Sequence, residues 1–374
     1  MQSIHNGFRV WLAFASLLMC AGGVSAATDG QQGVWPTTAV TAPPQHKPRI
    51  LLIHDMEGLA GQDDPYTFLY GHPNYPRGRQ LLVDDVNAVV DGLFRGGAAS
   101  VTVADGHGSG NPQPDLPVER LDPRAKLISR ASWFDAYLDL AEGGEFDAVV
   151  VVGMHAKSGS KGFASHTYTI GMELMIQGRS ITETELVAML YGRTGMPVIF
   201  ASGDDRLAAD LKTMPWLRYV TTKQATSASS ARLLPVAAVH REMRDEAKAA
   251  VENWRKARVI SFTGPIRVAV RAVPPANMKW LEGMPGVQYA NETVTFSAHN
   301  VVAAYRGVGP IVAALAFSFS DAENTAFERL PDAAALQHQG MVELYRRWFA
   351  AESSLAPPPA PAAKRSDEQY HGFH

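Results

Sequence analysis

The chain has little cysteine and no excess of charge of one sign. Its 374 residues contain one cysteine, Cys20, so an intramolecular disulfide is excluded and the fold must be held by its core or by metal. Lysine and arginine number 34 against 37 aspartate and glutamate residues, a formal net charge of −3 at pH 7. Because no basic patch interleaved with aromatic residues occurs either, nothing favours binding to nucleic acid or to an anionic membrane.

Hydrophobic runs long enough to suggest a membrane span are also lacking. The stretch Val10–Leu18 follows Arg9 and is itself followed by Val24-Ser25-Ala26, which has small residues at the −3 and −1 positions of a cleavage site. This pattern predicts a signal peptide over residues 1–26, and therefore a periplasmic or secreted protein without stable membrane insertion after cleavage. The stretch is shorter than the ~20 apolar residues that cross a bilayer. An uncleaved membrane anchor is the alternative.

Proline and polar residues flank the region that is expected to fold. Residues 27–47 are rich in Thr, Gln, Gly and Pro and predict a linker, whereas residues 353–374 contain the run APPPAPAAK and predict a disordered Pro-rich tail. The length between them allows two domains. We expect a metal-binding catalytic α/β domain over residues 48–222 and a second, smaller α/β domain over residues 223–352.

Strands and helices alternate through the first domain, which is typical of a mostly parallel βαβ sheet. Short hydrophobic runs predict strands, in chain order, over residues 49–54, 100–104, 126–129, 148–152 and 197–201. Apolar spacing predicts helices over 78–94, 133–140, 183–191 and 204–212, with a hairpin turning at Gln177-Gly178. The second domain is expected to contain helix 236–256, strand 266–272, a hairpin-like pair around Asn291 and an apolar helix over 301–317.

Potential metal ligands follow three of the predicted strands. Asp55 and Glu57 follow the first strand, His107 follows the second, and His155 follows the fourth. In an open α/β sheet, ligands and catalytic groups gather at the carboxyl ends of parallel strands, so these residues are expected to form one site. Asp55 and Glu57 are two apart and share a face of an extended segment, where a divalent cation relieves the repulsion between carboxylates.

His166 lies eleven residues beyond His155 across a polar loop. This spacing differs from the i, i+4 pair of a zincin helix, so the two histidines need not bind the same ion. One can bind metal while the other acts as acid, base or nucleophile. Each motif alone also has a simpler explanation, such as an N-cap aspartate, a surface histidine or a structural one.

Two glutamates at the start of the helix predicted over 183–191 can be told apart by capping. Thr182 is a good N-cap, and Glu185 at the third helical position completes a capping box with it. Glu183, at the first helical position, is then free to project into the cleft, and we choose it as the fifth ligand.

More carboxylates and histidines are available than one zinc ion needs, which suggests two adjacent ions bridged by a shared carboxylate. Asp55 is the natural bridge, because it is short and stands at a strand end. Imidazole ligands favour zinc, with manganese and cobalt as alternatives.

Several segments together resemble the zinc-dependent D-aminopeptidases of the DppA type, over roughly residues 50–317. The similarity rests on Asp55-Met56-Glu57-Gly58, Asn74–Arg79, His107, Gly153-Met154-His155-Ala156, Ser165-His166, Gly203-Asp204-Asp205-Arg206, Met284-Pro285-Gly286 and Glu292–Ala298. The resemblance implies two zinc ions per subunit, held by Asp55, Glu57, His107, His155 and Glu183. It also implies a catalytic role for His166 and assembly into a ring-shaped homodecamer.

The activity that the resemblance implies is hydrolysis of short peptides with an N-terminal D-residue, such as D-Ala-D-Ala. The predicted export signal and Pro-rich tail depart from the family pattern. Two other functions are alternatives: a metal-dependent amidase or phosphoesterase on the same scaffold, and a non-catalytic periplasmic peptide-binding protein.

Overall fold

The computed structural model describes residues 35–355 except 44, 129–134, 143, 275, 277, 283–285, 317–329 and 331. The predicted signal peptide with Cys20, most of the predicted tail, and Met284-Pro285 lie outside the described residues.

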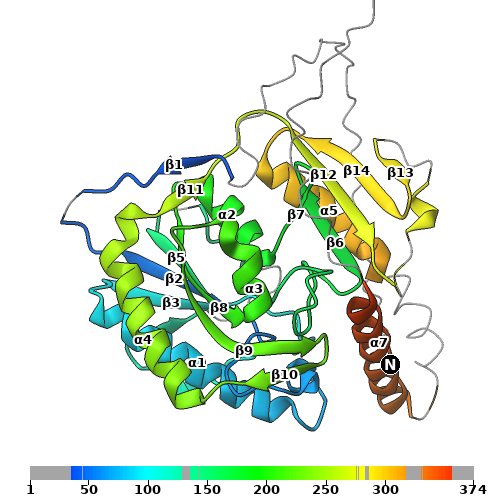
Figure 1. Ribbon diagram of the computed structural model, residues 1–374, viewed down its shortest axis with the longest axis horizontal. Helices are drawn as coiled ribbons and strands as arrows, with labels where there is room; N and C mark the ends of the chain where they lie inside the picture. The colour runs from blue at the N-terminus through cyan, green and yellow to red at the C-terminus, as the bar shows by residue number, and fades with distance from the viewer. Residues whose placement is uncertain are drawn as a thin grey trace, which may run out of the picture. The chain divides into compact units, whose positions relative to one another are not determined.

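A seven-stranded sheet forms the centre of the described part (Figure 1). Its strands, in spatial order, are β10 (Ser230–Leu233), β9 (Arg218–Ser227), β8 (Val198–Asp204), β5 (Ala148–Met154), β2 (Arg49–His54), β3 (Ser100–Asp105) and β4 (Lys126–Leu127). All neighbouring strands are parallel except β10, which pairs antiparallel with β9 at one edge. Every residue of β5 and β8 is buried, as expected for parallel strands covered on both faces.

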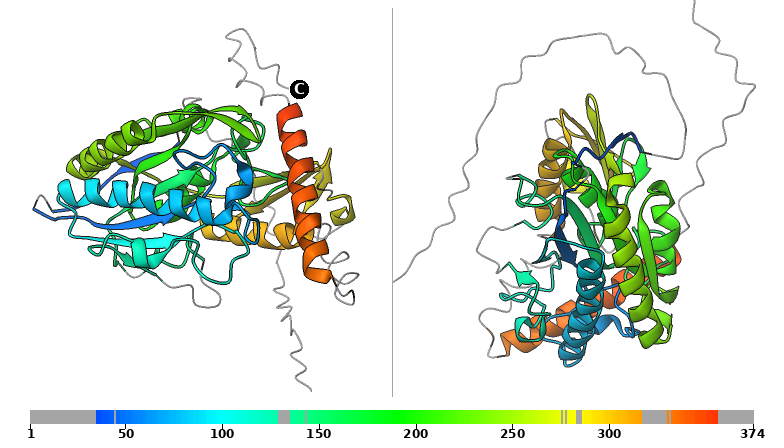
Figure 2. Two further views of the ribbon diagram at one scale, coloured as in Figure 1. Left: turned by 90° about the horizontal axis from the view of Figure 1, so that it is seen from below. Right: turned by 90° about the vertical axis from the view of Figure 1, so that its left-hand side faces the viewer.

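Alternate residues of the central strands supply two separate hydrophobic cores. Ile50 and Leu52 of β2 pack on one face with α1 (Tyr75–Arg95) and α4 (Val236–Asn253). Leu51 and Ile53 pack on the other face with α2 (Glu183–Gly192) and α3 (Asp205–Asp210). The alternation follows from the two-residue period of a strand. Figure 2 shows α1 and α4 on the same side of the sheet.

A second sheet of five strands packs into the core on the α2 side. Its strands, in spatial order, are β13 (Gln288–Ala290), β14 (Thr293–Ala298), β12 (Ile266–Ala272), β6 (Met172–Ile176) and β7 (Arg179–Ser180), all paired antiparallel. α5 (Val301–Ala316) contributes Ala304 and Val308 to the same core. The predicted fold class, a mostly parallel α/β sheet with a smaller second α/β unit, is confirmed.

The two sheets exchange segments across the predicted domain boundary. β6 and β7 come from the first part of the chain, yet β6 pairs with β12 of the second part. The boundary between residues 222 and 223 falls inside β9, a strand that was not predicted. Its Thr- and Ser-rich sequence resembles a linker, but it pairs with both β8 and β10. Because strands from distant parts of the chain pair within each sheet, composition alone does not locate a boundary between the two sheets.

Both predicted hairpins are present. β6 and β7 turn at Gln177 and Gly178, which have φ of 52° and 77°, and β13 and β14 turn at Asn291 and Glu292. Positive φ at both central residues is the geometry of a tight hairpin turn.

Three segments differ from expectation. In the predicted linker, β1 (Thr37–Ala39) pairs with β11 (Arg258–Ile260), and Trp35 is buried beside it. In the predicted helix over 133–140, the described residues 136–140 form turns. The C-terminal helix α7 (Ala333–Ser354) was not predicted, and it extends two residues into the predicted tail. Short 3-10 turns complete the elements: η1 (Pro65–Phe68), η2 (Val118–Arg120), η3 (Leu211–Thr213), η4 (Trp254–Lys256) and η5 (Lys279–Leu281).

No helix within the described part of the chain is both long and apolar enough to cross a membrane.

Trp35 is the residue through which the N-terminal segment enters the core. Its indole Nε1 donates a hydrogen bond of 2.7 Å to Glu185 Oε1, its ring lies 6.0 Å from that of Phe262, and the Arg179 guanidinium lies 4.6 Å above it. We expect Trp35→Ala to lower the free energy of unfolding by about 3–5 kcal/mol, because a cavity replaces a large buried ring. Urea denaturation measures this loss.

Val118→Ala is the control for this substitution, since Val118 is 59% exposed and its truncation is expected to change stability by about 0.5 kcal/mol or less. Equal effects of the two substitutions would show that residues 35–39 do not belong to the cooperative fold.

Candidate metal centre

The carboxyl edge of the central sheet collects the side chains that were predicted as metal ligands. β2 and β3 are aligned so that His54 is opposite Asp105, and β2 and β5 so that His54 is opposite Val152. Asp55, Glu57, His107 and His155 therefore leave the sheet at one edge, and the N-terminus of α2 adds Glu183. All five are buried.

The segment after β2 lies directly against the end of β5. The amide of Asp55 donates to the Val152 carbonyl at 2.8 Å, and the amide of Gly58 donates to the Gly153 carbonyl at 2.7 Å. A Cβ on Gly58 would lie 2.0 Å from the Met154 carbonyl oxygen, so only glycine allows this approach. This contact fixes the two carboxylates of the segment relative to His155.

Asp55 contacts two imidazoles through its two different oxygens. Its Oδ1 lies 2.8 Å from His107 Nδ1, and its Oδ2 lies 3.5 Å from His155 Nε2. Glu57 Oε2 lies 3.3 Å from the same His107 nitrogen. A carboxylate whose oxygens face separate ligand groups has the disposition that a bridge between two metal ions requires.

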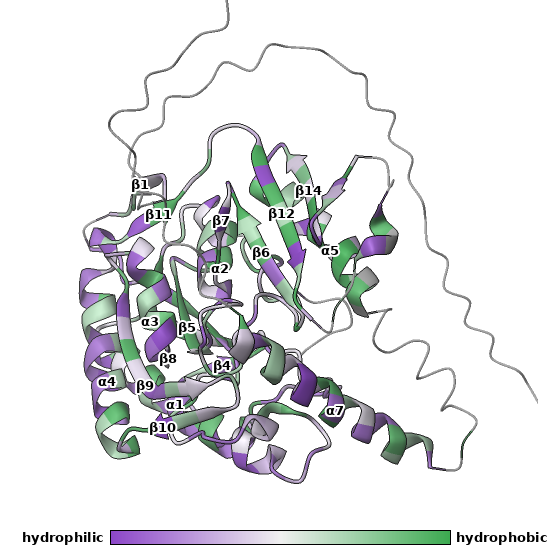
Figure 3. Cartoon of the chain, turned by 45° about the vertical axis from the view of Figure 1, so that its right-hand side comes forward, coloured by the Kyte–Doolittle hydropathy of each residue, from purple (hydrophilic) through white to green (hydrophobic). Residues whose placement is uncertain are grey.

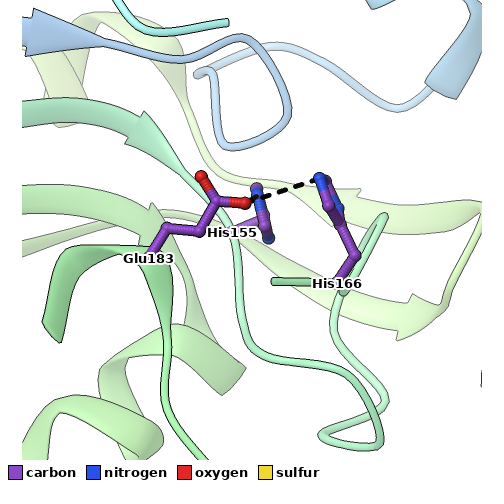
Figure 4. Close-up of side chains that lie close together, drawn as sticks. All are labelled: His155, His166 and Glu183. Carbon is purple, nitrogen blue, oxygen red and sulfur yellow. Dashed lines mark ion pairs between the residues drawn. The ribbon is translucent and has the colours of Figure 1, made fainter. Parts of the chain in front are cut away.

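Glu183 lies on the other side of His155. Its Oε1 is 3.3 Å from His155 Nε2 and 3.6 Å from His166 Nε2 (Figure 4). The His155 and His166 rings are stacked, with centroids 3.8 Å apart and an interplanar angle of 11°. His166 Nε2 is therefore nearly as close to the Glu183 carboxylate as the Nε2 atom of His155, which is a predicted metal ligand.

Two overlapping groups of donors can each hold an ion. They are Asp55, Glu57 and His155, and His155, His166 and Glu183, with the donor atoms of each group within 4.8 Å of one another. His155 belongs to both, while Asp55 links the first group to His107. The structure thus brings all six predicted site residues together, and its geometry does not by itself separate His166 from the ligands.

The pKa shifts of the clustered side chains show how strongly the buried carboxylates interact with the nearby imidazoles. Burial raises the pKa of Asp55, and the neighbouring Glu57 raises it further. Burial would also raise the pKa of Glu57, but His107 outweighs it and lowers that pKa to about 2. Burial works to lower the pKa of His155, yet the Glu183 carboxylate prevails and raises it to about 10. Carboxylates and imidazoles are therefore closely paired in this cluster, an arrangement that a divalent cation would also stabilise.

Backbone carbonyls set which nitrogen of each central imidazole faces the cluster. His155 Nδ1 donates to the Ala156 carbonyl at 3.0 Å, and His166 Nδ1 donates to the Ala164 carbonyl at 2.8 Å. Both Nε2 atoms then face Glu183. His155 Nε2 is buried and has no hydrogen-bond partner among the described residues. A buried nitrogen of this kind, surrounded by carboxylates, fits a divalent metal ion and indicates that the residues suit one.

The predicted capping box at the start of α2 is confirmed. The Thr182 hydroxyl accepts from the Glu185 amide at 3.1 Å, and Glu185 Oε2 accepts from the Thr182 amide at 2.9 Å, which completes the capping box. Glu185 Oε1 also accepts from Trp35 and Thr213. Glu185 is structural, and Glu183 faces the cluster.

Several residues that support the centre were not found from the sequence. The Tyr137 hydroxyl donates to Glu183 Oε2, and the Tyr168 amide donates to Glu183 Oε1 at 2.6 Å. Tyr168 has a φ of 72°, an unfavourable conformation for a tyrosine that often accompanies functional sites. The buried ammonium of Lys223 donates to the carbonyl of Glu57 at 2.5 Å and to Gln62. No local motif signals these contacts, because each joins segments far apart in sequence.

The resemblance also included Gly203-Asp204-Asp205-Arg206, and the structure gives Asp204 a supporting role. Asp204 Oδ1 caps α3 by accepting from the amides of Arg206 and Leu207, and Oδ2 accepts from the amide of Phe163 at 2.7 Å. It thereby anchors the loop between His155 and His166.

A cavity of about 220 Å³ opens onto the cluster. Its lining combines the site residues Asp55, Glu57, His107, His166 and Glu183 with Phe68, Gly106, Gly108, Tyr168, Thr169, Ile170, Met341, Tyr345 and Trp348. A second hollow of about 360 Å³, between Pro215 and Ala257, contains no imidazole or carboxylate in its lining. Of these two hollows, the smaller one carries the candidate site residues.

The fold and this centre define a metal-binding α/β protein with a small pocket over the cluster. A family model described as D-aminopeptidase matches residues 49–309. The chain therefore belongs to the D-aminopeptidase family, and it is a metallopeptidase.

Individual relatives agree with this assignment. A D-aminopeptidase of Bacillus subtilis (strain 168) is 29% identical over 262 residues, which cover 68% of this chain and 93% of the relative. The solved structure of the Zn-dependent D-aminopeptidase DppA from Bacillus subtilis, described as a self-compartmentalizing protease, superposes with a TM-score of 0.65. That match has 27% identity and covers 72% of this chain and 99% of the other.

The two glutamates of α2 provide a matched test of the centre. We expect Glu183→Gln to reduce the metal content of the purified protein, since a neutral amide replaces a charged ligand. Glu185→Gln is the control: glutamine can still complete the capping box, so metal content should match wild type. Elemental analysis after dialysis measures both. Equal metal content in the two variants would contradict the assignment of Glu183.

Proposed function

We propose that this protein is an exported binuclear zinc aminopeptidase that releases an N-terminal D-residue from short peptides such as D-Ala-D-Ala. The observation that supports it most directly is Asp55, whose two oxygens face His107 on one side and His155 on the other. The relatives named D-aminopeptidase and the zinc dependence stated for DppA support the substrate and the metal.

Asp55, Glu57, His107, His155 and Glu183 would hold the metal. Zinc, when bound, supplies Lewis acidity that polarises a scissile carbonyl and lowers the pKa of water toward ~7. Tyr137 and the Tyr168 amide orient Glu183, and Lys223 holds the backbone of Glu57 in place. These contacts preorganise the ligands, which tunes both metal affinity and ligand orientation.

His166 is proposed as the residue that transfers a proton. Because its Nδ1–H is held by the Ala164 carbonyl, Nε2 carries the lone pair and can accept a proton within the pocket. Stacking on His155 fixes the plane of the ring. Phe68, Tyr345 and Trp348 give this side of the cavity an aromatic lining.

The setting of the reaction is also part of the proposal. Export through the predicted signal peptide would expose the enzyme to D-Ala-containing peptides shed from peptidoglycan. Self-association is proposed because DppA is described as self-compartmentalizing. Sequencing the N-terminus of protein recovered from the periplasm, and determining the mass of the purified assembly in solution, test these two points.

We expect D-Ala-D-Ala to be hydrolysed faster than L-Ala-L-Ala, and a chelator to abolish turnover until Zn²⁺, Mn²⁺ or Co²⁺ is restored. The measurement is a peptide hydrolysis assay combined with elemental analysis, which is expected to give two ions per chain. Faster hydrolysis of simple amides or phosphate esters would favour the amidase or phosphoesterase alternative, and full activity of metal-free protein would exclude a metal mechanism.

His166→Ala is expected to lower kcat by about 10²–10⁴-fold, the usual contribution of a positioned acid or base, with metal content unchanged. The control is His299→Ala, because His299 is an exposed histidine outside the pocket. His166 also lies close enough to His155 and Glu183 to bind the same metal ion. A fall in metal content together with kcat would therefore identify His166 as a metal ligand instead.

A further inference from the structure

The C-terminal helix α7 lies beyond the residues that match the family, yet it forms part of the pocket. The family match ends at residue 309, and α7 spans Ala333–Ser354. Met341, Tyr345 and Trp348 of this helix line the same cavity as the predicted ligands. In the left view of Figure 2, α7 runs across the direction of α1. The wall that it supplies is therefore a feature of this chain in addition to the matched family region.

The pocket-facing residues of α7 occupy one side of the helix. Met341, Tyr345 and Trp348 are spaced by four and three residues, which places them on one face; Glu352, outside the cavity lining, follows four residues later on the same face. Figure 3 shows that α7 carries both hydrophobic and hydrophilic residues along its length. Trp348 is fully buried, whereas Arg347 beside it is exposed.

Aromatic contacts connect this face to the residues around the metal centre. The Trp348 ring lies edge-on to that of His166, with centroids 5.2 Å apart and an interplanar angle of 89°. Tyr345 contacts both Trp348 and Phe68 at 5.6 and 5.8 Å, and Phe68 stands edge-on to His107 at 6.0 Å. One continuous aromatic wall thus reaches from His166 to His107.

A buried carboxylate attaches the other end of α7 to the loop that carries His166. Glu352 accepts hydrogen bonds from the Ser158 hydroxyl at 2.5 Å and from the Gly159 amide at 2.8 Å. Both donors belong to the loop between His155 and His166. Since Glu352 is fully buried and doubly hydrogen-bonded, α7 is fixed at a defined distance from the centre.

We propose that α7 is the wall that limits the size of the substrate's N-terminal side chain, with Trp348 and Met341 as specificity-determining residues. This inference rests on the proposed aminopeptidase function. A substrate whose amine and scissile carbonyl lie at the metal centre has its first side chain within a few ångströms of it. The cavity of about 220 Å³ is smaller than the roughly 300–1,000 Å³ of sites for drug-sized ligands, so the room beside the amine and the scissile carbonyl is limited and α7 bounds it on one side.

The chemistry of the wall also selects the kind of side chain. Apart from the residues of the centre, the cavity lining contains glycine, threonine, aliphatic and aromatic residues, and α7 contributes no charged group to it. A small apolar side chain such as that of D-alanine suits this lining, whereas a charged one would lose its hydration without gaining a partner.

The test compares kcat/KM for two peptide series with Trp348→Ala, Met341→Ala and wild type. In the first series, D-Xaa-D-Ala, Xaa is alanine, leucine or phenylalanine; in the second, D-Ala-D-Xaa, only the second residue changes. We expect Trp348→Ala to raise the D-Leu to D-Ala ratio at the first position by about tenfold or more, within the range that pocket volume commonly contributes to selectivity. Met341→Ala is expected to shift the same ratio less.

Arg347→Ala is the matched control, because this neighbour on α7 is exposed and pairs with Glu343 rather than with the pocket. Metal content and thermal stability are measured for each variant. If Trp348→Ala does not fold, Met341→Ala and Trp348→Phe decide the question. An unchanged first-position ratio in folded, active variants, or a shift confined to the second position, overturns the inference. Absence of turnover by wild type on every peptide would instead overturn the proposed function.

Discussion

Burial of three carboxylates in one pocket is the constraint on which the rest of the site depends. Asp55, Glu57 and Glu183 are each 5% exposed or less, and such groups remain charged in a protein interior only when opposite charge is close. The imidazoles of His107 and His155 provide it in the structure as described, and a divalent metal would replace their protons. Each supporting contact, from Tyr137 to Lys223, holds one of these groups in place.

The parallel sheet explains why such a costly cluster can be assembled. Strands β2 and β5 are almost entirely buried, and β2 is held in register with both β3 and β5, so the residues just beyond these strands emerge at fixed positions. The close approach of Gly58 to β5 and the capping box of α2 then define where Glu57 and Glu183 point. A rigid scaffold of this kind supplies the preorganisation that catalysis by positioned charges requires.

The family region and the C-terminal helix contribute different properties to the pocket. The predicted ligands and His166 all lie within residues 49–309, whereas the aromatic residues of α7 line the cavity from outside that region. Two buried hydrogen bonds from the His155–His166 loop to Glu352 connect the two parts. The residues of the candidate centre thus fall within the matched region, while the wall of the pocket includes residues that the family match does not cover.

Local sequence determined the features that depend on neighbouring residues. The apolar runs before Asp55, His107 and His155 specified buried strands, and Thr182 with Glu185 specified a helix start that leaves Glu183 free. Positions set by long-range contacts were decided only by the tertiary structure: Trp35 meets Glu185 across 150 residues, and Glu352 meets Ser158 across 194. Periodicity and capping report interactions within a few residues, so neither the buried N-terminal segment nor the wall formed by α7 could be inferred from them. The sequence by itself determined which residues could bind metal, and the folded chain decided what surrounds them.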